Sequence, residues 1–266
     1  MNLNTQTYES LSSIFSRDFS SLLLLPKIEK LINKQEPTLE DVLGLCSHNE
    51  SLLIKLTRRA GFGSNEDEFA KEILFKKGLS FLKSLAIRTM NQEIFSLPLK
   101  LEGMTEYKIK RRAVVLARFI KHFYEILGVK PDDAYLCGLF YNFTYVSFEK
   151  LIADNLMSVC DFEEVKDVCI DLTSTALKEI GFDTVITSFI EDSNKELHST
   201  KFPFGHALSR IGNTLLINSE DTLSSNIGRG SGVDRQLLDA TGLTTREIVN
   251  VLKDLTRNYK GGLGRQ

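Results

Sequence analysis

The apolar residues of this chain recur with the period of an α-helix along most of its length. The clearest case is the segment 105–127, where one stripe carries Ile109, Ala113, Leu116, Ala117, Ile120, Tyr124 and Leu127. No segment shows the strict apolar–polar alternation between hairpin turns that is typical of a strand. Only 17 glycines and 5 prolines interrupt the 266 residues. The pattern therefore predicts an all-α fold.

Capping residues and helix breakers predict where the helices begin and end. We expect helices to begin at or near Pro26, Thr38, Asn49, Gly78, Thr105, Pro131 and Asp161, and shorter ones to cover 183–192, 204–217, 234–241 and 245–258. Glycines are expected to end three helices, at Gly61 as a left-handed residue and at Gly128 and Gly181. The helix that begins at Pro131 is expected to continue through Phe143. Residues 1–16 predict a frayed segment or a short leading helix.

Composition narrows the classes of partner. Lys plus Arg total 33 and Asp plus Glu total 35, which leaves a net charge of −2. A general nucleic-acid binder usually has a basic excess, so nucleic acid is not expected. The longest apolar run, Leu22–Pro26, is far too short to span a bilayer, and residues 1–20 do not have the pattern of a signal peptide. No membrane association is expected.

The four cysteines are widely spaced, at Cys46, Cys137, Cys160 and Cys169. No two of them form a Cys-x-x-Cys pair, and scattered cysteines in a chain of this length are typical of buried thiols in a reducing compartment. We therefore expect a cytoplasmic protein.

The order of several motifs resembles a known family, the HDOD domains. A Leu-Pro start at Leu25-Pro26-Lys27 leads through successive helices to Ala60-Gly61, as at the opening of that domain. Ala134–Phe140 is similar to the family's A-x-x-A-G-L-L segment, and Leu238–Leu255 is similar to its closing helices. The resemblance covers roughly 20–255, and its motifs are mostly patterned apolar positions.

The resemblance implies an HD-like helical fold in which an N-terminal helical subdomain is packed on an HD-like bundle. We expect the following division: an N-terminal extension 1–17, an HDOD-like domain 18–258 with subdomains 18–102 and 103–258, and a flexible tail 259–266. HDOD domains are relatives of HD-type metal phosphohydrolases and are generally regarded as non-catalytic. Their active relatives bind metal through dispersed histidines and an adjacent His-Asp pair.

The chain departs from that metal-binding pattern at the decisive positions. Tyr141 and Asn142 stand where the resemblance implies the His-Asp pair, and Arg112 stands where it implies an upstream histidine. The later histidine positions fall near Cys169 and near the pair Ser193-Asn194. A guanidinium repels a divalent cation, a phenol is neutral at pH 7, and a carboxamide offers one weak ligand. We therefore expect no metal, no cofactor and no catalytic residue.

Other residues have a structural and a functional interpretation. The cluster Tyr141, Asn142, Phe143 and Tyr145 is expected to fill the core where a metal site would have been, and the alternative is a residual pocket for a small ligand. His206 is expected to be a hydrogen-bonded or surface histidine. The glycine-rich segment 228–232 lacks the Lys-Ser/Thr of a P-loop and predicts an exposed loop.

The basic residues have the same two interpretations. They form a possible contact face made of Lys55, Arg58, Arg59, Lys108, Lys110, Arg111 and Arg112. The structural interpretation is the solvated side of an amphipathic helix, whose aliphatic stems cover the core. The functional interpretation is a site for a phosphate, a nucleotide or an acidic partner.

The sequence thus favours a non-catalytic module of bacterial signal transduction that binds a protein partner. Because residues 1–16 are too few to form another domain, we expect it to act in trans or as a homodimer. One alternative is an HD-type phosphohydrolase whose ligands are atypical. A second is a nucleotide or nucleic-acid binder that uses the basic helix 105–127, although that helix lacks interleaved aromatic residues.

Overall fold

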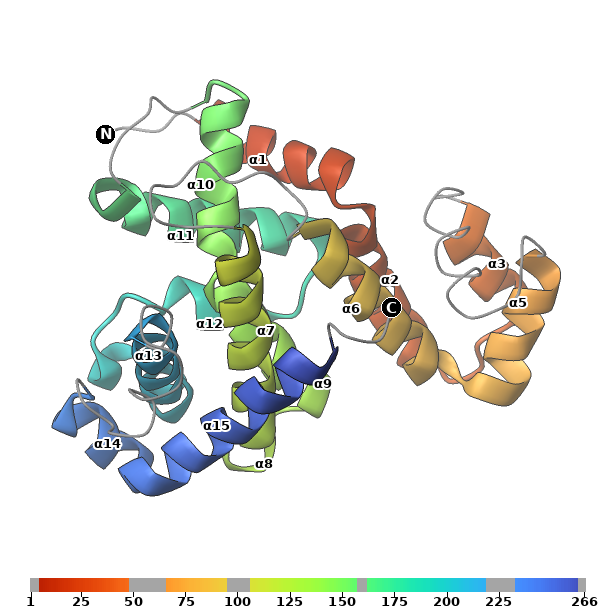
Figure 1. Cartoon of the computed structure of the whole chain (residues 1–266). Helices are drawn as coiled ribbons and strands as arrows, with labels where there is room; N and C mark the ends of the chain where they lie inside the picture. The colour runs from red at the N-terminus through yellow and green to blue at the C-terminus, as the bar shows by residue number, and fades with distance from the viewer. Residues whose placement is uncertain (1–4, 48–65, 95–105, 157–161, 219–232, 263–266) are drawn as a thin grey trace. The chain divides into compact units, whose positions relative to one another are not determined.

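A computed structural model describes residues 5–47, 66–94, 106–156, 162–218 and 233–262 (Figure 1). The described residues form helices, joined by turns and short irregular segments, and contain no strand, so the predicted all-α fold is confirmed. Within these ranges, none of the helices combines the length and the hydrophobicity needed to cross a lipid bilayer. The expected helix from Asn49 to Gly61 and the glycine-rich segment 228–232 lie outside the described residues.

The chain divides into two compact units. Met1–Leu97 and Ala176–Asp183 make up the first unit, and Pro98–Thr175 and Thr184–Gln266 make up the second. The segment 176–183 contains the end of a long helix that begins in the second unit. No pattern in the sequence indicated that the end of this helix belongs to the first unit.

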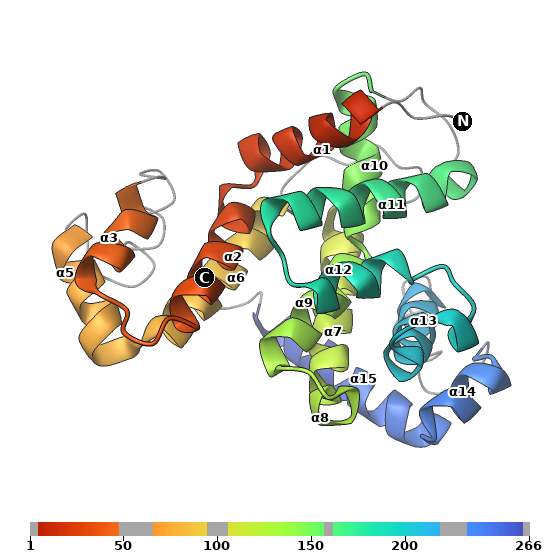
Figure 2. The ribbon, with the colours of Figure 1, turned by 180° about the vertical axis from the view of Figure 1, so that it is seen from behind.

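The first unit contains the following elements: α1 (Thr5–Asp18), α2 (Ser20–Ile32), α3 (Leu39–Ser47), α5 (Glu66–Glu72), the π-helical turn η1 (Ile73–Lys77) and α6 (Leu79–Ile94). Helices α2 and α6 lie side by side in both views (Figures 1 and 2). The leading segment is helical, and its Leu11 and Phe15 are fully buried. The polar stretch before Gly78, for which the sequence predicted no helix, forms α5 and η1.

The expected start of a helix at Pro26 is wrong. Pro26 lies inside α2, which begins at Ser20. The carboxylate of Glu93 on α6 accepts hydrogen bonds from the backbone N–H of Ser21 at 3.0 Å and from the Ser21 hydroxyl. Glu93 therefore satisfies a donor that the first turn of α2 would leave unpaired. This cap comes from a residue far away in the sequence, which local patterns do not reveal.

The expected helix start near Thr38 is confirmed, and a capping box forms there. The backbone N–H of Thr38 donates to the Asp41 carboxylate at 2.8 Å, and the N–H of Asp41 donates to the Thr38 hydroxyl at 3.2 Å. The Lys34 ammonium also donates to Asp41, at 2.6 Å. Hydrogen bonds from Lys34 and Thr38 lower the pKa of the Asp41 carboxyl to about 2.

A largely buried ion pair joins α2 to α6. The Lys83 ammonium lies 2.6 Å from the Glu29 carboxylate, and the two side chains are 7% and 24% exposed. Glu29→Gln should destabilise the protein by about 1–2 kcal/mol, because it leaves a buried cation without its charged partner. Urea denaturation measures this loss. Lys76→Gln is the control, because Lys76 is 73% exposed in its pair with Glu72, so no loss is expected. Equal effects of the two changes would contradict the prediction.

The second unit contains the remaining elements: α7 (Glu106–His122), α8 (Tyr124–Leu127), α9 (Pro131–Tyr141), α10 (Phe143–Ala153), α11 (Phe162–Ile180, whose last turn belongs to the first unit), α12 (Thr184–Glu191), the 3-10 turn η2 (Leu197–Ser199), α13 (Pro203–Asn218), α14 (Arg235–Thr241) and α15 (Thr245–Gly262). The predicted stops at Gly128 and Gly181 are confirmed, with φ angles of 66° and 100°. The predicted start at Pro131 is confirmed as well.

Two predicted helices are each divided. The helix expected over 105–127 breaks at Phe123, which is 8% exposed and whose ring packs edge-on against Phe119 and Phe204. The helix expected to run from Pro131 through Phe143 ends at Tyr141, and α10 begins after Asn142. Both breaks fall where buried side chains enter the core, so tertiary contacts outweigh the local helical pattern.

The core of the second unit lies between α7, α13 and α15. Phe119, Leu208 and Leu252 are fully buried in it. Tyr259 contacts this cluster, and α15 extends to Gly262, beyond the expected start of a flexible tail at 259. The apolar stripe of 105–127 is therefore the centre of this unit.

Candidate functional site

The crossing of α7 and α9 determines where the expected His-Asp position lies. A Cβ atom on Gly138 would lie 2.7 Å from the Ala117 Cα and 2.9 Å from the Leu116 carbonyl oxygen, so the two backbones touch at this glycine. Near the end of α7 and the start of α9, the Lys121 ammonium lies 3.4 Å from the Asp132 carboxylate. These contacts give an antiparallel register. One turn farther along, the same register places Arg112 of α7 at the level of Asn142, which directly follows α9.

The structure buries the residues at the expected metal positions. Asn142 is 1% exposed, Arg112 is 7% exposed and Cys169 is fully buried as a free thiol. Arg112 therefore does not belong to an exposed contact face, unlike the half-buried Arg111 beside it. Cys169 lies on α11 one turn before Thr173, whose hydroxyl donates to Ser147 of α10 at 2.7 Å. Cys169 is thus placed beside α10.

Tyr141 is held by an arginine that the sequence did not single out. The Arg210 side chain on α13 is hydrogen-bonded to the Tyr141 hydroxyl. The same guanidinium donates to the carbonyl oxygen of Ser193 at 3.2 Å and to that of Lys195. Arg210 therefore ties the end of α9 to α13 and to the segment after α12. Tyr141, a member of the cluster that was expected to fill the core, is therefore bound by a cation.

The phenol of Tyr141 should ionise only at high pH. Burial raises its pKa to about 12, although the Arg210 charge and hydrogen bond act in the opposite direction. A spectrophotometric pH titration of the protein, minus that of Tyr141→Phe, isolates this group. We expect a transition near pH 12, and a still higher one after Arg210→Met because the lowering charge is lost. A difference transition near the ordinary value of about 10 would contradict the burial of the phenol.

Asp192 is an acid of this region that the sequence did not single out. The residue is 4% exposed, and its carboxylate accepts hydrogen bonds from the Lys195 ammonium at 2.7 Å and from the backbone N–H of Lys201 at 3.1 Å. Burial alone would raise the pKa of Asp192, but the two hydrogen bonds outweigh it and the pKa is lowered. Asp192 is therefore a charged carboxylate that is already engaged by the Lys195 cation and by a backbone donor. Its neighbour Ser193 is buried, whereas Asn194 is exposed.

His206 differs from the expectation of a hydrogen-bonded or surface residue. Its ring is fully buried and stacks on Phe189, with ring centroids 4.5 Å apart. Among the described residues, neither ring nitrogen has a hydrogen-bond partner. Burial lowers the pKa of His206 to about 4, opposed by the Asp192 charge and aided by Arg210 and Lys195. The imidazole is therefore neutral at pH 7.

Unpartnered polar atoms extend along α13 from His206. The Ser209 hydroxyl and the Asn213 carbonyl oxygen follow at helical spacing, and neither has a hydrogen-bond partner among the described residues. The amide nitrogen of Asn142, the residue that follows Tyr141, also has no hydrogen-bond partner among the described residues. Such atoms cost about 1–3 kcal/mol each when nothing satisfies them. The region is therefore polar, but it offers scattered single donors and acceptors instead of a ligand set.

A divalent metal of the kind that active HD-type relatives bind does not fit these residues. Arg112 is a permanent cation, the Tyr141 phenol stays protonated and Asn142 offers one amide oxygen. Asp192 and His206 lie close enough for each charge to act on the other. In the part of the chain that the structure describes, however, no group of three or more His, Cys, Asp or Glu side chains could hold a metal ion.

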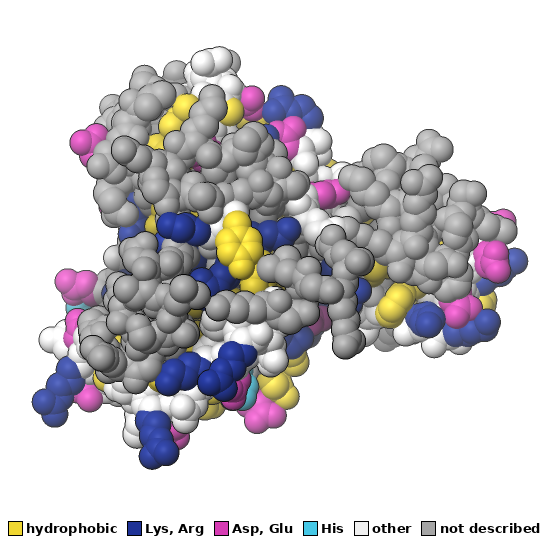
Figure 3. Space-filling view, in the orientation of Figure 1, with side chains coloured by type: hydrophobic (Ala, Val, Ile, Leu, Met, Phe, Trp, Pro, Cys, Tyr) yellow, Lys and Arg dark blue, Asp and Glu magenta, His cyan; other side chains and the backbone are white. Residues whose placement is uncertain are grey.

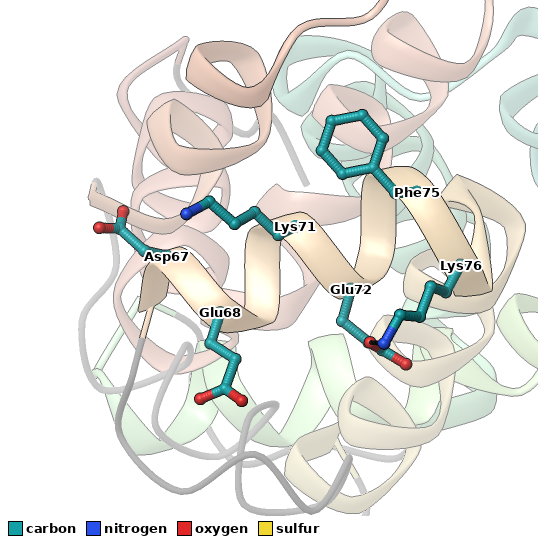
Figure 4. Close-up of a pocket in the computed structure, with 6 residues that line it drawn as sticks. All are labelled: Asp67, Glu68, Lys71, Glu72, Phe75 and Lys76. Carbon is teal, nitrogen blue, oxygen red and sulfur yellow. Dashed lines mark ion pairs between the residues drawn. The ribbon is translucent and has the colours of Figure 1, made fainter.

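A surface pocket in the first unit offers no alternative site (Figure 4). It is lined by Asp67, Glu68, Lys71, Glu72, Phe75 and Lys76. All of these side chains come from one stretch formed by α5 and η1. The Lys76 ammonium pairs with the Glu72 carboxylate at 2.9 Å, and Phe75 is 73% exposed. The basic residues Lys55, Arg58 and Arg59 of the expected contact face lie outside the described residues.

Comparisons with known proteins indicate the fold. No protein-family model matches the chain, and no curated protein matches it. The chain is similar to a crystal structure of a candidate phosphohydrolase from Shewanella amazonensis SB2B, with a TM-score of 0.58 and 13% sequence identity. The similarity covers 96% of this chain and 96% of the other. At this identity the similarity shows the fold alone: the chain has an all-α, HD-like fold.

Proposed function

We propose that this protein is a non-catalytic module of the HDOD type that acts in bacterial signal transduction by binding another protein. The resemblance of its motifs to HDOD domains supports this reading, as does its HD-like fold. The observation that carries the proposal is the chemistry of the expected metal centre. There Arg112 is buried at the level of Asn142, and Tyr141 is bound to Arg210.

These residues are unsuited to metal-assisted hydrolysis, because they are poor metal ligands and because the nearby acid already has partners. A hydrolytic metal needs several anionic or imidazole ligands and an open position for a water molecule. Here a cation and neutral groups occupy the corresponding positions, and the nearby Asp192 is engaged by Lys195 and Lys201. Binding therefore remains as the activity that this fold can support without a metal.

A hydrolysis screen tests the non-catalytic part of the proposal. The protein is assayed with Mn²⁺ or Fe²⁺ against bis-p-nitrophenyl phosphate, p-nitrophenyl phosphate, cyclic dinucleotides and nucleoside triphosphates. We expect no turnover above that of the buffer. Asp192→Asn and His206→Gln are the controls, because any turnover that survives both belongs to a contaminant. Metal-dependent turnover that both variants abolish would refute the proposal.

One observation favours a second candidate function. The similar Shewanella protein is described as a candidate phosphohydrolase, and the two chains match over nearly their full length. A phosphohydrolase would need an acid and an imidazole beside the expected centre, and Asp192 and His206 are an acid and an imidazole of this region that act on each other. The same screen and the same two variants decide between the candidates.

A further inference from the structure

Helix α7 carries an aromatic and cationic stripe that the proposed centre does not use. Arg111 and Arg118 follow Tyr107 after four and eleven residues, which are roughly one and three helical turns. The three residues therefore share one side of α7. Tyr107 is 47% exposed, and Arg118 is exposed as well.

Two other helices contribute tyrosines to the same surface. The rings of Tyr107 and Tyr259 of α15 lie with their centroids 6.4 Å apart at an angle of 58°. Burial and the neighbouring Tyr107 raise the pKa of Tyr259, Arg118 and Arg111 lower it, and Tyr135 of α9 raises it. All four side chains therefore lie near enough to the Tyr259 hydroxyl to act on its charge. We name these five residues the Tyr/Arg surface.

The basic helix 105–127 was expected to lack interleaved aromatic residues, but it carries Tyr107, and α9 and α15 add Tyr135 and Tyr259. Figure 3 shows Lys and Arg side chains beside exposed hydrophobic surface in the part of this face where α7 lies in Figure 1. Among the described residues, neither Arg111 nor Arg118 forms an ion pair, and the buried Nε of Arg111 has no hydrogen-bond partner. The surface therefore has donors and positive charge to offer to a partner.

We propose that the Tyr/Arg surface binds an acidic segment of a partner protein. This inference rests on the proposed function and names the surface and the chemistry of its partner. Carboxylates match the two guanidinium groups, which can hold them with charge-assisted hydrogen bonds. Tyrosine and arginine are also the residues that contribute most to binding energy in protein interfaces.

A polypeptide fits this surface better than a nucleic acid. A nucleic-acid strand needs a cationic track along several phosphates, and the chain has a net charge of −2 without a basic excess. The Tyr/Arg surface is instead a compact patch with two arginines among three tyrosines. Such a patch can hold one or two carboxylates while the rings cover neighbouring apolar atoms.

Fluorescence anisotropy with a labelled oligoglutamate peptide carrying one leucine tests the proposal on the full-length protein. We expect saturable binding that weakens at least ~10-fold in Arg111→Glu/Arg118→Glu, since each charge-assisted contact contributes about 1.4 kcal/mol or more. Tyr107→Ala should weaken binding several-fold. The matched control is Arg235→Glu/Arg246→Glu, which makes the same charge change at exposed positions of α14 and α15 and should bind like the unmodified protein.

Several outcomes would overturn the proposal. The first is an absence of binding, and the second is an equal loss in the control variant, because it would show that only net charge matters. Tighter binding of a labelled oligothymidylate than of the peptide would assign the surface to single-stranded nucleic acid. The readout is independent of hydrolysis, so failure of this proposal and failure of the non-catalytic function are distinguishable.

Discussion

Gly138→Ala should destabilise the protein by about 3 kcal/mol, which lowers the melting temperature by roughly 6–12 °C. The new Cβ would lie 2.7 Å from the Ala117 Cα and 2.9 Å from the Leu116 carbonyl oxygen. Both are backbone atoms, so no side-chain rotation can relieve the clash and α7 and α9 must move apart. Urea denaturation and thermal melting followed by circular dichroism measure the effect.

Gly44→Ala is the matched control for this prediction. Gly44 lies inside α3, and a Cβ atom there would meet nothing within 4 Å. The same substitution should stabilise the protein by about 0.5–1 kcal/mol, because alanine is the better helix former. If Gly138→Ala were neutral, the α7–α9 crossing, and with it the placement of Arg112 opposite Asn142, would be wrong.

The second large effect is a loss of stability in acid that depends on His206. The unfolded chain takes up the imidazole proton near pH 6.5, whereas burial lowers the pKa of the folded group to about 4. Between these pH values the unfolded state binds more protons, so lowering the pH favours unfolding. The contribution of His206 is fully present above pH 6.5, and about 3 kcal/mol of it is lost as the pH falls to 4.

His206→Gln provides the comparison, because glutamine does not titrate. The free energy of unfolding of both proteins is measured by urea denaturation at intervals from pH 8 to pH 4. The unmodified protein should lose about 3 kcal/mol relative to the variant within this window. The charged groups that act on the imidazole are Asp192, which raises its pKa, and Arg210 and Lys195, which lower it. Parallel curves for the two proteins would show that His206 is not buried in neutral form.

Local signals were sufficient where a helix end depends on its own residues. The helix starts near Thr38 and at Pro131 and the helix end at Gly128 were predicted correctly, because each residue satisfies or constrains nearby backbone groups. Pro26 was misread because the start of α2 is capped by Glu93, a residue of another helix. The break at Asn142 was missed for a related reason, since the surrounding sequence continues the apolar pattern.

Only those residues of the candidate site that fall in a motif of the resembled family could be predicted from the sequence. The resemblance placed Tyr141, Asn142 and Arg112 in one region, and the α7–α9 register is consistent with that placement. Arg210 and Asp192 were missed because their roles depend on contacts made by the segments around α13, which no spacing along the chain reveals. The same limit hid the Tyr/Arg surface, whose tyrosines come from different helices.

The central claim is that the expected metal centre cannot hold a metal, and metal analysis tests it most directly. The protein is expressed and purified with Mn²⁺, Fe²⁺ or Zn²⁺ present, exchanged into metal-free buffer, and measured by inductively coupled plasma mass spectrometry. An active HD-type phosphohydrolase treated in the same way is the positive control. We predict far less than one ion per chain. A stoichiometric ion, with anomalous diffraction density ligated by protein atoms near Arg112 and Asn142, would contradict the account.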